Sequence, residues 1–307
     1  MPGLKKIQGV IVPMVTPFTE HGKIDESATI RITEHLVRNN VSPFILGTTG
    51  ESASIPDVFR LPFVKIVIKA VQSRTMVFAG ISSNCLETSV ELGKQYFDSG
   101  IDAVVAHLPS YYAFSDDQML KYFECLADRL PGPLIVYNIP LTTHLSIPLK
   151  VVEKLSYHPN IIGMKDSERD PKRLQDAVKI SMGRTDFSHI LGWNAKMAEA
   201  LLMGSDGIVP STGNIFPKIY RTLYEAAIRG EKESAMRFQK LTDEISAVYQ
   251  KDRMLGQSLT ALKVIMHMMG LCLPYVLPPL TQLSSEEEKI IRKKVKELNL
   301  ESQFIKN

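Results

Sequence analysis

The chain has 307 residues, of which 44% are hydrophobic and 22% are charged. This length and hydrophobic content suffice for a large core, and an α/β barrel of this size folds as a single domain. The 36 basic and 33 acidic side chains nearly balance, so the sequence lacks the concentrated positive charge of nucleic-acid-binding proteins. We therefore expect no nucleic-acid partner. We also expect no membrane-spanning segment, because no apolar stretch is long enough to form one.

The three cysteines, Cys85, Cys125 and Cys272, are far apart in the sequence. They form no CxxC pair, so neither a disulfide framework nor a zinc knuckle is indicated, and we interpret them as reduced thiols. The N-terminal segment MPGLKKIQGVIVPM contains only a short apolar run, which Pro13 interrupts. Such a run is more typical of a first strand than of a secretion signal, so we expect a cytoplasmic protein.

Short runs rich in Val, Ile and Leu alternate along the chain with longer segments of helical period. Most of these runs are apolar throughout, which is typical of parallel strands buried on both faces. The expected strands are 9–18, 43–48, 76–81, 103–109, 133–140, 161–166, 188–193 and 206–212. The expected helices between them are 25–40, 58–72, 85–100, 115–130, 148–156, 171–182 and 195–204. This alternation predicts a closed (β/α)₈ barrel, because parallel strands need crossover helices. A doubly wound open sheet is the alternative, but it would typically need fewer strands.

The pattern changes after the eighth expected strand. The remaining helices are expected at 214–230, 231–252, 256–271 and 284–300, with no further strand. The first of these completes the barrel, so we assign residues 1–230 to the barrel and 231–307 to a C-terminal helical extension of the same domain. Residues typical of helix starts are Asp25, Ser115 and Pro171, and those typical of helix ends are Gly100, Gly204 and Gly230.

Lys165 stands near the end of the expected strand 161–166, in the segment IIGMKD. In α/β barrels, catalytic groups lie where the strands end and the βα loops begin. Desolvation inside a barrel disfavours the ammonium form of a lysine and lowers its pKa. It leaves a neutral amine that can attack a carbonyl group. The alternatives are a lysine that extends to the solvent at the barrel mouth and one that pairs with Asp166.

Tyr137 lies near the end of the preceding expected strand, in the segment VYNIP. Because adjacent strands are about 5 Å apart, Tyr137 and Lys165 can share one pocket. A phenol in that position can serve as a general acid and base. A buried tyrosine whose hydroxyl is satisfied by an ordinary hydrogen bond is the structural alternative.

The segment GTTGES, residues 47–52, follows the second expected strand. Its glycines let the backbone approach a ligand closely, and its hydroxyls and amides suit a carboxylate. It is not a nucleotide-binding loop, since no GKS or GKT follows and the chain contains no GxGxxG. An ordinary glycine-rich connection is the alternative.

Two further groups follow expected strands. Tyr111 and Tyr112 come after the fourth strand, on a loop from which they could reach a pocket, an interface or only the surface. Val209 lies in the eighth strand, where many barrels bind an anion, although core packing explains this residue equally well.

With GTTGES, YYAFS, YNIP, GMKDS and GSDGIV in this order, the chain resembles the dihydrodipicolinate synthase/N-acetylneuraminate lyase family. The resemblance runs from the segment GVIVPMVTPF to the helical C-terminus. It implies a (β/α)₈ barrel and a class I aldolase mechanism, with Lys165 forming a Schiff base with pyruvate or a related 2-keto acid. It implies Tyr137 as the central acid and base, with Thr48 connecting it to Tyr112. In the family that tyrosine enters from a neighbouring subunit, so a homotetramer, a dimer of dimers, is expected.

The resemblance also implies how the keto acid is held. Thr49 would bind its carboxylate together with nearby backbone amides, including that of Gly47. Gly192 and Val209 match positions that line the pocket through their backbone. Neither a cofactor nor a metal is expected, because the protonated imine itself stabilises the carbanion.

One segment departs from the pattern of the true dihydrodipicolinate synthases. In those enzymes an arginine follows the YNVP motif and binds the carboxylate of the aldehyde substrate. Here the segment is YNIPLTTHLSI, with Thr142 at that position. A charge-assisted contact to a second carboxylate is therefore missing from this loop. Thr142 and Thr143 better suit the hydroxyl groups of a sugar-like substrate.

We therefore expect a pyruvate-dependent carbon–carbon lyase that acts on a 2-keto-3-deoxy sugar acid or a sialic-acid-like substrate. One alternative is 4-hydroxy-tetrahydrodipicolinate synthase, which joins pyruvate to aspartate semialdehyde and would need a basic residue from elsewhere in the chain. Another is a dehydratase or hydratase-aldolase that uses the same imine. A third, from a different class, is a non-catalytic keto-acid sensor, which would need no proton relay.

Overall fold

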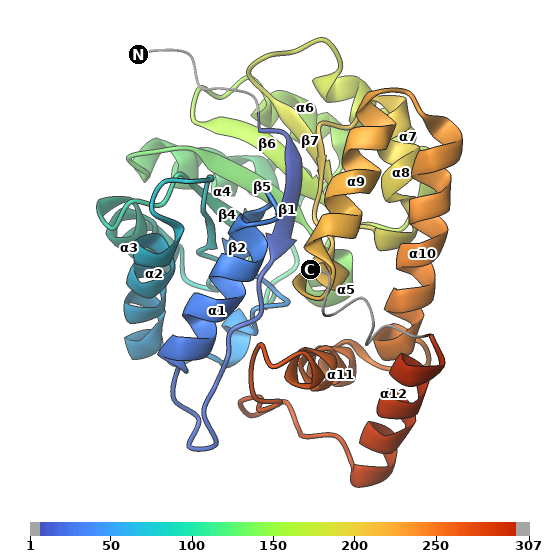
Figure 1. Ribbon diagram of the computed structural model, residues 1–307. Coiled ribbons are helices and arrows are strands. Elements are labelled where there is room, and N and C mark those ends of the chain that lie inside the picture. The colour runs from blue at the N-terminus through green and yellow to red at the C-terminus, as the bar shows by residue number, and fades with distance from the viewer. Residues whose placement is uncertain (1–6, 299–307) are drawn as a thin grey trace.

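Eight parallel strands close into a barrel in sequence order, and β1 pairs with both β2 and β8. The computed structural model describes residues 7–298. The strands are β1 (Gly9–Pro13), β2 (Ser42–Ile45), β3 (Phe78–Gly80), β4 (Ala103–His107), β5 (Leu134–Asn138), β6 (Ile161–Asp166), β7 (Ser188–Leu191) and β8 (Gly207–Ile208). Figure 1 shows them at the centre of the molecule, with helices around them. The predicted (β/α)₈ barrel is confirmed, and the doubly wound alternative is wrong.

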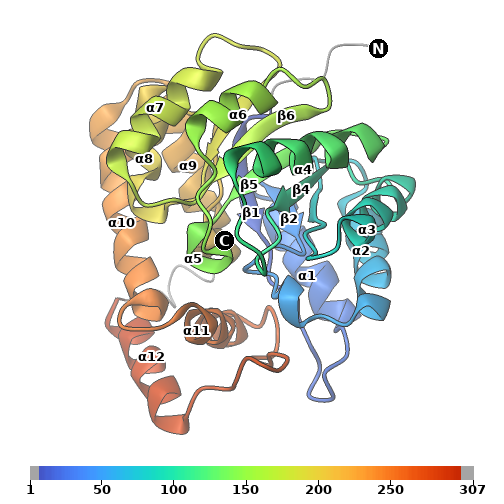
Figure 2. The same cartoon turned by 180° about the vertical axis from the view of Figure 1, so that it is seen from behind.

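Helices follow the strands and cover the outside of the barrel (Figures 1 and 2). They are α1 (Glu26–Val37), α2 (Asp57–Val71), α3 (Leu86–Asp98), α4 (Asp116–Arg129), α5 (Pro140–Thr143), α6 (Leu149–Leu155), α7 (Pro171–Ser181), α8 (Met197–Met203) and α9 (Pro217–Ile228). The predicted C-terminal helices are also present, as α10 (Lys232–Gln250), α11 (Leu255–Met268) and α12 (Ser285–Glu297). The end of the predicted helix 284–300 lies outside the described residues. None of the helices between residues 7 and 298 has the length and apolar character needed to cross a bilayer.

Most of the strands are shorter than the apolar runs that predicted them. The run 9–18 is a strand only as far as Pro13, although Val15 and Phe18 beyond it are also buried. The run 206–212 contributes only Gly207–Ile208 to the sheet, and its end forms the 3₁₀ turn η3 (Ser211–Asn214). Apolar composition marks burial rather than backbone pairing, so it overestimates strands wherever a βα loop is itself buried.

The predicted helix starts are supported by side-chain caps. The Asp25 carboxylate accepts a hydrogen bond from the Ala28 backbone N–H at 3.0 Å, and the Ser115 hydroxyl accepts one from the Gln118 backbone N–H at 3.3 Å. Such caps satisfy donors that the first helical turn leaves unpaired. At the other end of a helix, Gly204 closes α8 in the left-handed conformation with φ of 107°.

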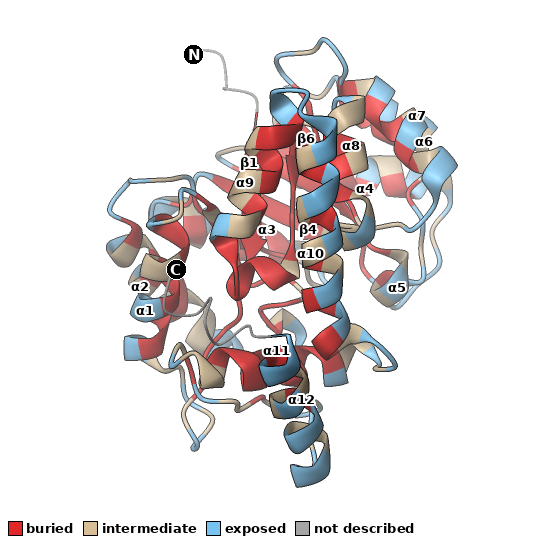
Figure 3. Cartoon of the chain, turned by 45° about the vertical axis from the view of Figure 1, so that its right-hand side comes forward, coloured by how far each residue is buried: buried red, intermediate tan, exposed pale blue. Residues whose placement is uncertain are grey.

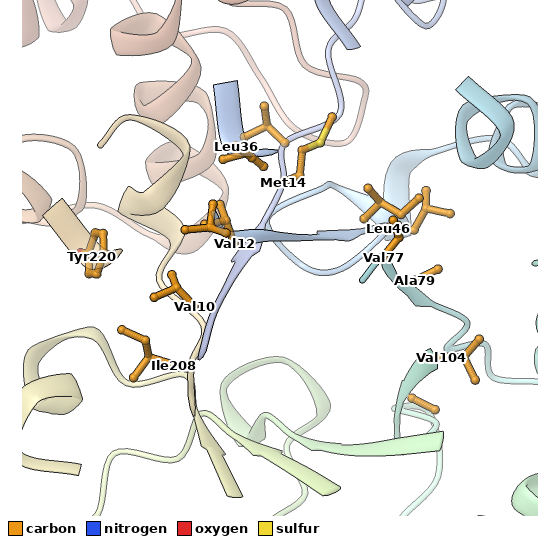
Figure 4. Packing of buried hydrophobic residues seen from close by; sticks show 14 of the residues in the cluster. Val10, Val12, Met14, Leu36, Leu46, Val77, Ala79, Val104, Ile208 and Tyr220 are labelled. Atoms are coloured by element: carbon orange, nitrogen blue, oxygen red, sulfur yellow. The ribbon is translucent and has the colours of Figure 1, made fainter. Parts of the chain in front are cut away.

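Side chains along each strand alternate between two apolar clusters. On β1, Val10 and Val12 belong to the cluster between the strands and the helices (Figure 4), whereas Ile11 points into the barrel. The interior cluster consists of Ile7, Ile11, Phe44, Phe78, Ala103, Val105, Ile135, Tyr137, Ile139, Ile162, Ile190 and Val209. Figure 3 shows the strands as buried. The inside of the barrel is therefore an apolar environment, which matters for any polar group placed there.

Helices α11 and α12 lie at the end of the barrel toward which β1 points, whereas α10 runs along the outside of the barrel beside α9 (Figure 1). A buried ion pair joins α11 to the loop after β2, between Lys263 Nζ and the carboxylate of Glu51. Lys263 Nζ also donates to the Tyr275 carbonyl oxygen at 2.8 Å. Burial lowers the pKa of Lys263 and raises the pKa of Glu51, while each group opposes this shift in the other. If one partner were removed, the charge of the other would remain buried without water to solvate it.

Lys263→Met should destabilise the protein strongly, because it leaves Glu51 buried without its cation. We expect the free energy of unfolding in urea to fall by about 3–5 kcal/mol. The double variant Glu51→Gln/Lys263→Met should recover about half of that loss, since no unpaired charge remains. Lys240→Met, at an exposed position of α10, is the matched control and should change stability by less than about 0.5 kcal/mol. A double variant no more stable than Lys263→Met would contradict this view of the pair.

Candidate active site

Lys165 lies on β6 with its amine inside the barrel mouth, and the residue is only 5% exposed. The register pairs it with Tyr137 on β5, and Lys165 Nζ is 3.7 Å from the centroid of the Tyr137 ring. The ring of Phe44 lies 4.8 Å from the same atom. Burial lowers the pKa of Lys165, and the neighbouring Tyr137 raises it to a lesser extent. The environment therefore favours a neutral amine.

Asp166 is turned away from Lys165, as expected for consecutive residues of a strand. Its carboxylate accepts hydrogen bonds from Arg173 Nε at 2.8 Å and from Asn138 Nδ2 at 2.9 Å. Within residues 7–298, Lys165 has no ion-pair partner. The two structural alternatives for this lysine, pairing with Asp166 and extension to the solvent, are therefore wrong.

Tyr137 is also buried, and its hydroxyl lies 3.3 Å from Thr48 Oγ1. Thr48 and the buried Thr49 belong to the loop after β2, which is fixed at several points. Thr16 Oγ1 donates to the Gly50 carbonyl oxygen at 2.7 Å, and Glu51 forms the ion pair with α11. The structure thus brings a phenol and a threonine hydroxyl together beside the amine of Lys165.

These groups line a cavity of about 360 Å³ at the barrel mouth, a size common for small-molecule sites. Of the residues suggested by the sequence, six line it: Thr48, Thr49, Tyr137, Lys165, Gly192 and Val209. Gly192 has no room for a side chain, because a Cβ atom there would lie 2.1 Å from Ser167 Oγ. Gly47 lies just behind the lining, where a Cβ would lie 2.7 Å from the Phe44 ring.

Besides Gly47, four of the suggested residues do not line this cavity within the described chain, namely Thr142, Thr143, Tyr111 and Tyr112. Thr142 lies on α5, and its hydroxyl faces the Ile139 carbonyl oxygen at 3.4 Å, while its neighbour Leu141 lines the cavity instead. Tyr112 is 68% exposed on the loop after β4 and contacts only the ring of Tyr111 among aromatic side chains of the described chain, at 5.0 Å. Within the described chain, Tyr112 therefore does not contribute to this cavity.

The sequence did not point to the outer wall of the cavity. Arg169 follows β6, Asn194 follows β7, and Arg253 stands between α10 and α11. Further lining residues from the same regions are Ser211, Tyr249, Gln250, Met254, Leu255, Ser258 and Leu259. A signal for Arg169 and Asn194 was their position just after a strand. The signal for Arg253 was weaker, namely the break between two predicted helices.

Trp193 borders an adjoining hollow of about 470 Å³, which shares Arg169, Asn194 and Gln250 with the main cavity.

Within residues 7–298, no three or more His, Cys, Asp or Glu side chains are grouped so that they could hold a metal ion. What the mouth offers is a desolvated amine, an adjacent phenol and a set of hydroxyls. A buried lysine beside a tyrosine at the mouth of a (β/α)₈ barrel has the groups that a class I, Schiff-base-forming lyase needs.

Comparison with known proteins identifies the family. Residues 6–298 match the Dihydrodipicolinate synthetase family, and the chain belongs to it. A DapA-like lyase of Thermofilum pendens is 29% identical, over 96% of this chain and 98% of its own. The 4-hydroxy-tetrahydrodipicolinate synthase of Laribacter hongkongensis is 30% identical, over 96% of this chain and 99% of its own.

Solved structures agree with this assignment. Dihydrodipicolinate synthase from Bacteroides thetaiotaomicron superposes with a TM-score of 0.91 at 32% identity, covering 96% of this chain and 99% of its own. YagE from E. coli K12, described in complex with pyruvate, gives a TM-score of 0.90 at 26% identity over the same shares of the two chains. The similarity therefore spans the barrel and the C-terminal helices together.

Tyr137→Phe should shift the pH dependence of the Lys165 amine to lower pH. Only the neutral amine reacts, so its labelling by an amine-selective acylating reagent falls as pH falls through its pKa. Tyr137 raises that pKa, so removing the phenol should move the labelling midpoint down. The measurement is the labelling rate at Lys165 by peptide mass spectrometry across a pH series. Tyr157→Phe, at an exposed position remote from the cavity lining, should leave the midpoint unchanged; an upward shift for Tyr137→Phe would count against the assignment.

Proposed function

We propose that this protein makes or breaks a carbon–carbon bond between pyruvate and an aldehyde through an imine on Lys165. The observation that carries the proposal is the buried Lys165 amine, 3.7 Å from the centre of the Tyr137 ring, inside a ligand-sized cavity. Support for pyruvate comes from relatives: YagE and the Acinetobacter baumannii synthase are both described in complex with it.

In this mechanism the neutral Lys165 amine attacks the keto carbon, and the carbinolamine hydroxyl takes a proton from Tyr137 and leaves as water. The resulting iminium ion withdraws electrons, so the Tyr137 phenolate takes a proton from the methyl carbon and an enamine forms. The enamine carbon adds to the aldehyde carbon, and the aldehyde oxygen takes that proton back from Tyr137. Water then hydrolyses the new imine, which frees the Lys165 amine and returns a proton to Tyr137. Thr48, 3.3 Å from the Tyr137 hydroxyl, is the next member of the proton path.

Thr49 and the backbone of the loop after β2, including Gly47, are proposed to bind the pyruvate carboxylate. The backbones of Gly192 and Val209 would complete the wall around the keto acid, since both residues line the cavity. A side chain at Gly192 would occupy this space, as the short distance to Ser167 indicates. We therefore propose that the aldehyde occupies the outer side of the cavity.

For the aldehyde, our proposal is a substrate of the 2-keto-3-deoxy sugar-acid or sialic-acid type. The second candidate is the 4-hydroxy-tetrahydrodipicolinate synthase reaction with aspartate semialdehyde, which the names of several relatives favour. Thr142 stands where the true dihydrodipicolinate synthases have an arginine, but it does not line the cavity. The loop after β5 therefore distinguishes the two candidate aldehydes less clearly than the sequence suggested.

We further propose that the protein is a homotetramer in the cytoplasm and that Tyr112 enters the site of a neighbouring subunit. The exposure of Tyr111 and Tyr112, at 77% and 68%, suits residues that contact another chain. Residues 1–230 and 231–307 are proposed to act as one domain, because α10 and α11 contribute to the cavity wall. Free cysteines, two of them exposed, suit a reducing compartment.

Incubation with pyruvate and borohydride should reduce the imine and attach the three-carbon unit irreversibly to Lys165. Peptide mapping should find the adduct there and not on Lys263, which is equally buried but does not line the cavity. Lys165→Met should abolish labelling, and Thr48→Val should lower kcat by about 10²-fold by interrupting the proton path. Wild-type protein that shows no adduct on Lys165 would falsify the proposal.

The role of Tyr112 can be tested by subunit mixing. Lys165→Met and Tyr112→Phe should each be nearly inactive alone. In a mixed assembly, a subunit with intact Lys165 can receive an intact Tyr112 from its Lys165→Met neighbour, so activity should return. The measurement is lyase activity after the two variants are dissociated and reassociated together, with each variant treated alone as the control. No recovery in assemblies shown to be mixed would mean that Tyr112 does not act across subunits.

A further inference from the structure

The active-site cavity has an unusual charge balance. Its lining contains Lys165, Arg169 and Arg253 but no aspartate or glutamate from the described part of the chain. Since burial disfavours the charged form of Lys165, the positive charge of the lining comes from the two arginines. The wall of the cavity is therefore suited to an anion.

Arg253 has donors that the protein leaves unused. Its Nη1 donates to the Val248 carbonyl oxygen at 3.2 Å, whereas its Nη2 forms no hydrogen bond within residues 7–298. Its Nε also lacks a partner but is itself buried, so Nη2 is the donor that a ligand in the cavity would meet. Glu287 feels the charge of Arg253, but the backbone N–H and hydroxyl of Ser284 dominate the lowering of the Glu287 pKa. Arg253 forms no ion pair with an acid between residues 7 and 298. Leaving guanidinium donors unsatisfied is costly, unless a ligand accepts from them.

Arg169 is likewise without an ion-pair partner in the described chain, and the acids near it are engaged elsewhere. Glu168 accepts hydrogen bonds from Asn138 Nδ2 at 2.9 Å and from Ser146 Oγ at 2.6 Å. Asp243, which borders the adjoining hollow with Arg169, accepts from Gln239 Nε2 at 2.8 Å. The Arg169 guanidinium is thus available at the exposed rim of the cavity.

The first turn of α11 adds to the same wall. Leu255 and Ser258, at the start of this 14-residue helix, line the cavity next to Arg253. The amino end of a helix carries partial positive charge and favours a nearby anion. This effect is small, but it has the same sign as the two arginines.

We propose that Arg169 and Arg253 form a subsite for an acidic group at the far end of the aldehyde substrate. The proposal rests on the proposed function, in which the keto-acid carboxylate occupies the inner part of the cavity beside Thr49. A second anionic group, on the aldehyde, would then contact Arg169 and Arg253. Neither arginine belongs to the loop after β5. The substrate class becomes an aldehyde that carries a carboxylate or a phosphate, or the corresponding doubly acidic 2-keto product.

The absence of an arginine at position 142 no longer argues against an acidic aldehyde, because this subsite supplies positive charge from other segments. Among the sugar-type substrates proposed above, the subsite favours those whose aldehyde part is itself acidic, because a neutral sugar chain would leave both guanidinium groups without a charged partner. Planar guanidinium groups match the geometry of carboxylate and phosphate oxygens and bind them through paired hydrogen bonds. Carboxylate and phosphate groups are both bound in this way. They are distinguished by comparing kinetic constants for substrates that carry one or the other.

The test is a panel of aldehydes assayed with pyruvate as the second substrate. Succinic semialdehyde is compared with its neutral carboxamide, and glyceraldehyde 3-phosphate with glyceraldehyde. We expect kcat/KM to be higher for at least one acidic member than for its neutral counterpart, and the preferred pair identifies carboxylate or phosphate. Arg253→Gln and Arg169→Gln should each lower kcat/KM for the acidic aldehyde about 10- to 100-fold, mainly through KM, with little change for the neutral one.

Two controls separate this proposal from the function on which it rests. Pyruvate trapping on Lys165 should proceed at the wild-type rate in both variants, which also shows that they are folded. Arg237→Gln, at an exposed position of α10 that lines neither cavity, should change no kinetic constant. Absence of trapping in the wild-type protein would reject the lyase mechanism itself. Normal trapping with no preference for acidic aldehydes, or equal losses for charged and neutral aldehydes in the variants, would overturn the subsite alone.

Discussion

Lys165 holds its amine against the rings of Tyr137 and Phe44, above a barrel interior made of apolar side chains. Two opposing effects act on the proton of this amine. Contact with aromatic faces favours the ammonium ion by about 0.5–2 kcal/mol, whereas full burial can lower the pKa of a lysine by about 3–5 units. Burial is the larger effect here. In the proposed mechanism every later step depends on this balance, because a protonated amine has no electron pair with which to attack a ketone.

The same constraint explains why the neighbouring acid is placed as it is. A carboxylate beside the amine would restore the ammonium ion, and Asp166 is adjacent in the sequence. Strand alternation turns Asp166 outward, where Arg173 and Asn138 bind it. The outward network also holds β5 and β6 in register at Tyr137 and Lys165. Asp166 therefore aligns the two strands without restoring the charge that burial disfavours on Lys165.

Much of the barrel and the inner site could be predicted from the sequence, because their physical signals are local. Continuous apolar runs indicated strands buried on both faces, and Lys165 stood out as a charge at the end of such a run. Tyr137 followed from strand spacing. The placements of Arg253 and Thr142 did not follow. Each depends on how a short irregular segment is oriented, and neither the α10–α11 break nor the four-residue α5 has a periodicity that fixes the direction of a side chain.

The inner and outer halves of the cavity are also positioned by different parts of the fold. The inner half is built on adjacent strands of a closed sheet, whose register fixes the position of Lys165 relative to Tyr137. The outer half comes from βα loops and from the segment that joins two C-terminal helices, anchored to the loop after β2 by the buried pair of Glu51 and Lys263. Substitutions in that outer wall can change charge and shape without disturbing the amine. In the proposed mechanism, imine formation and aldehyde recognition can therefore vary independently, which is why the outer arginines, rather than Lys165, bear on the proposed choice of aldehyde.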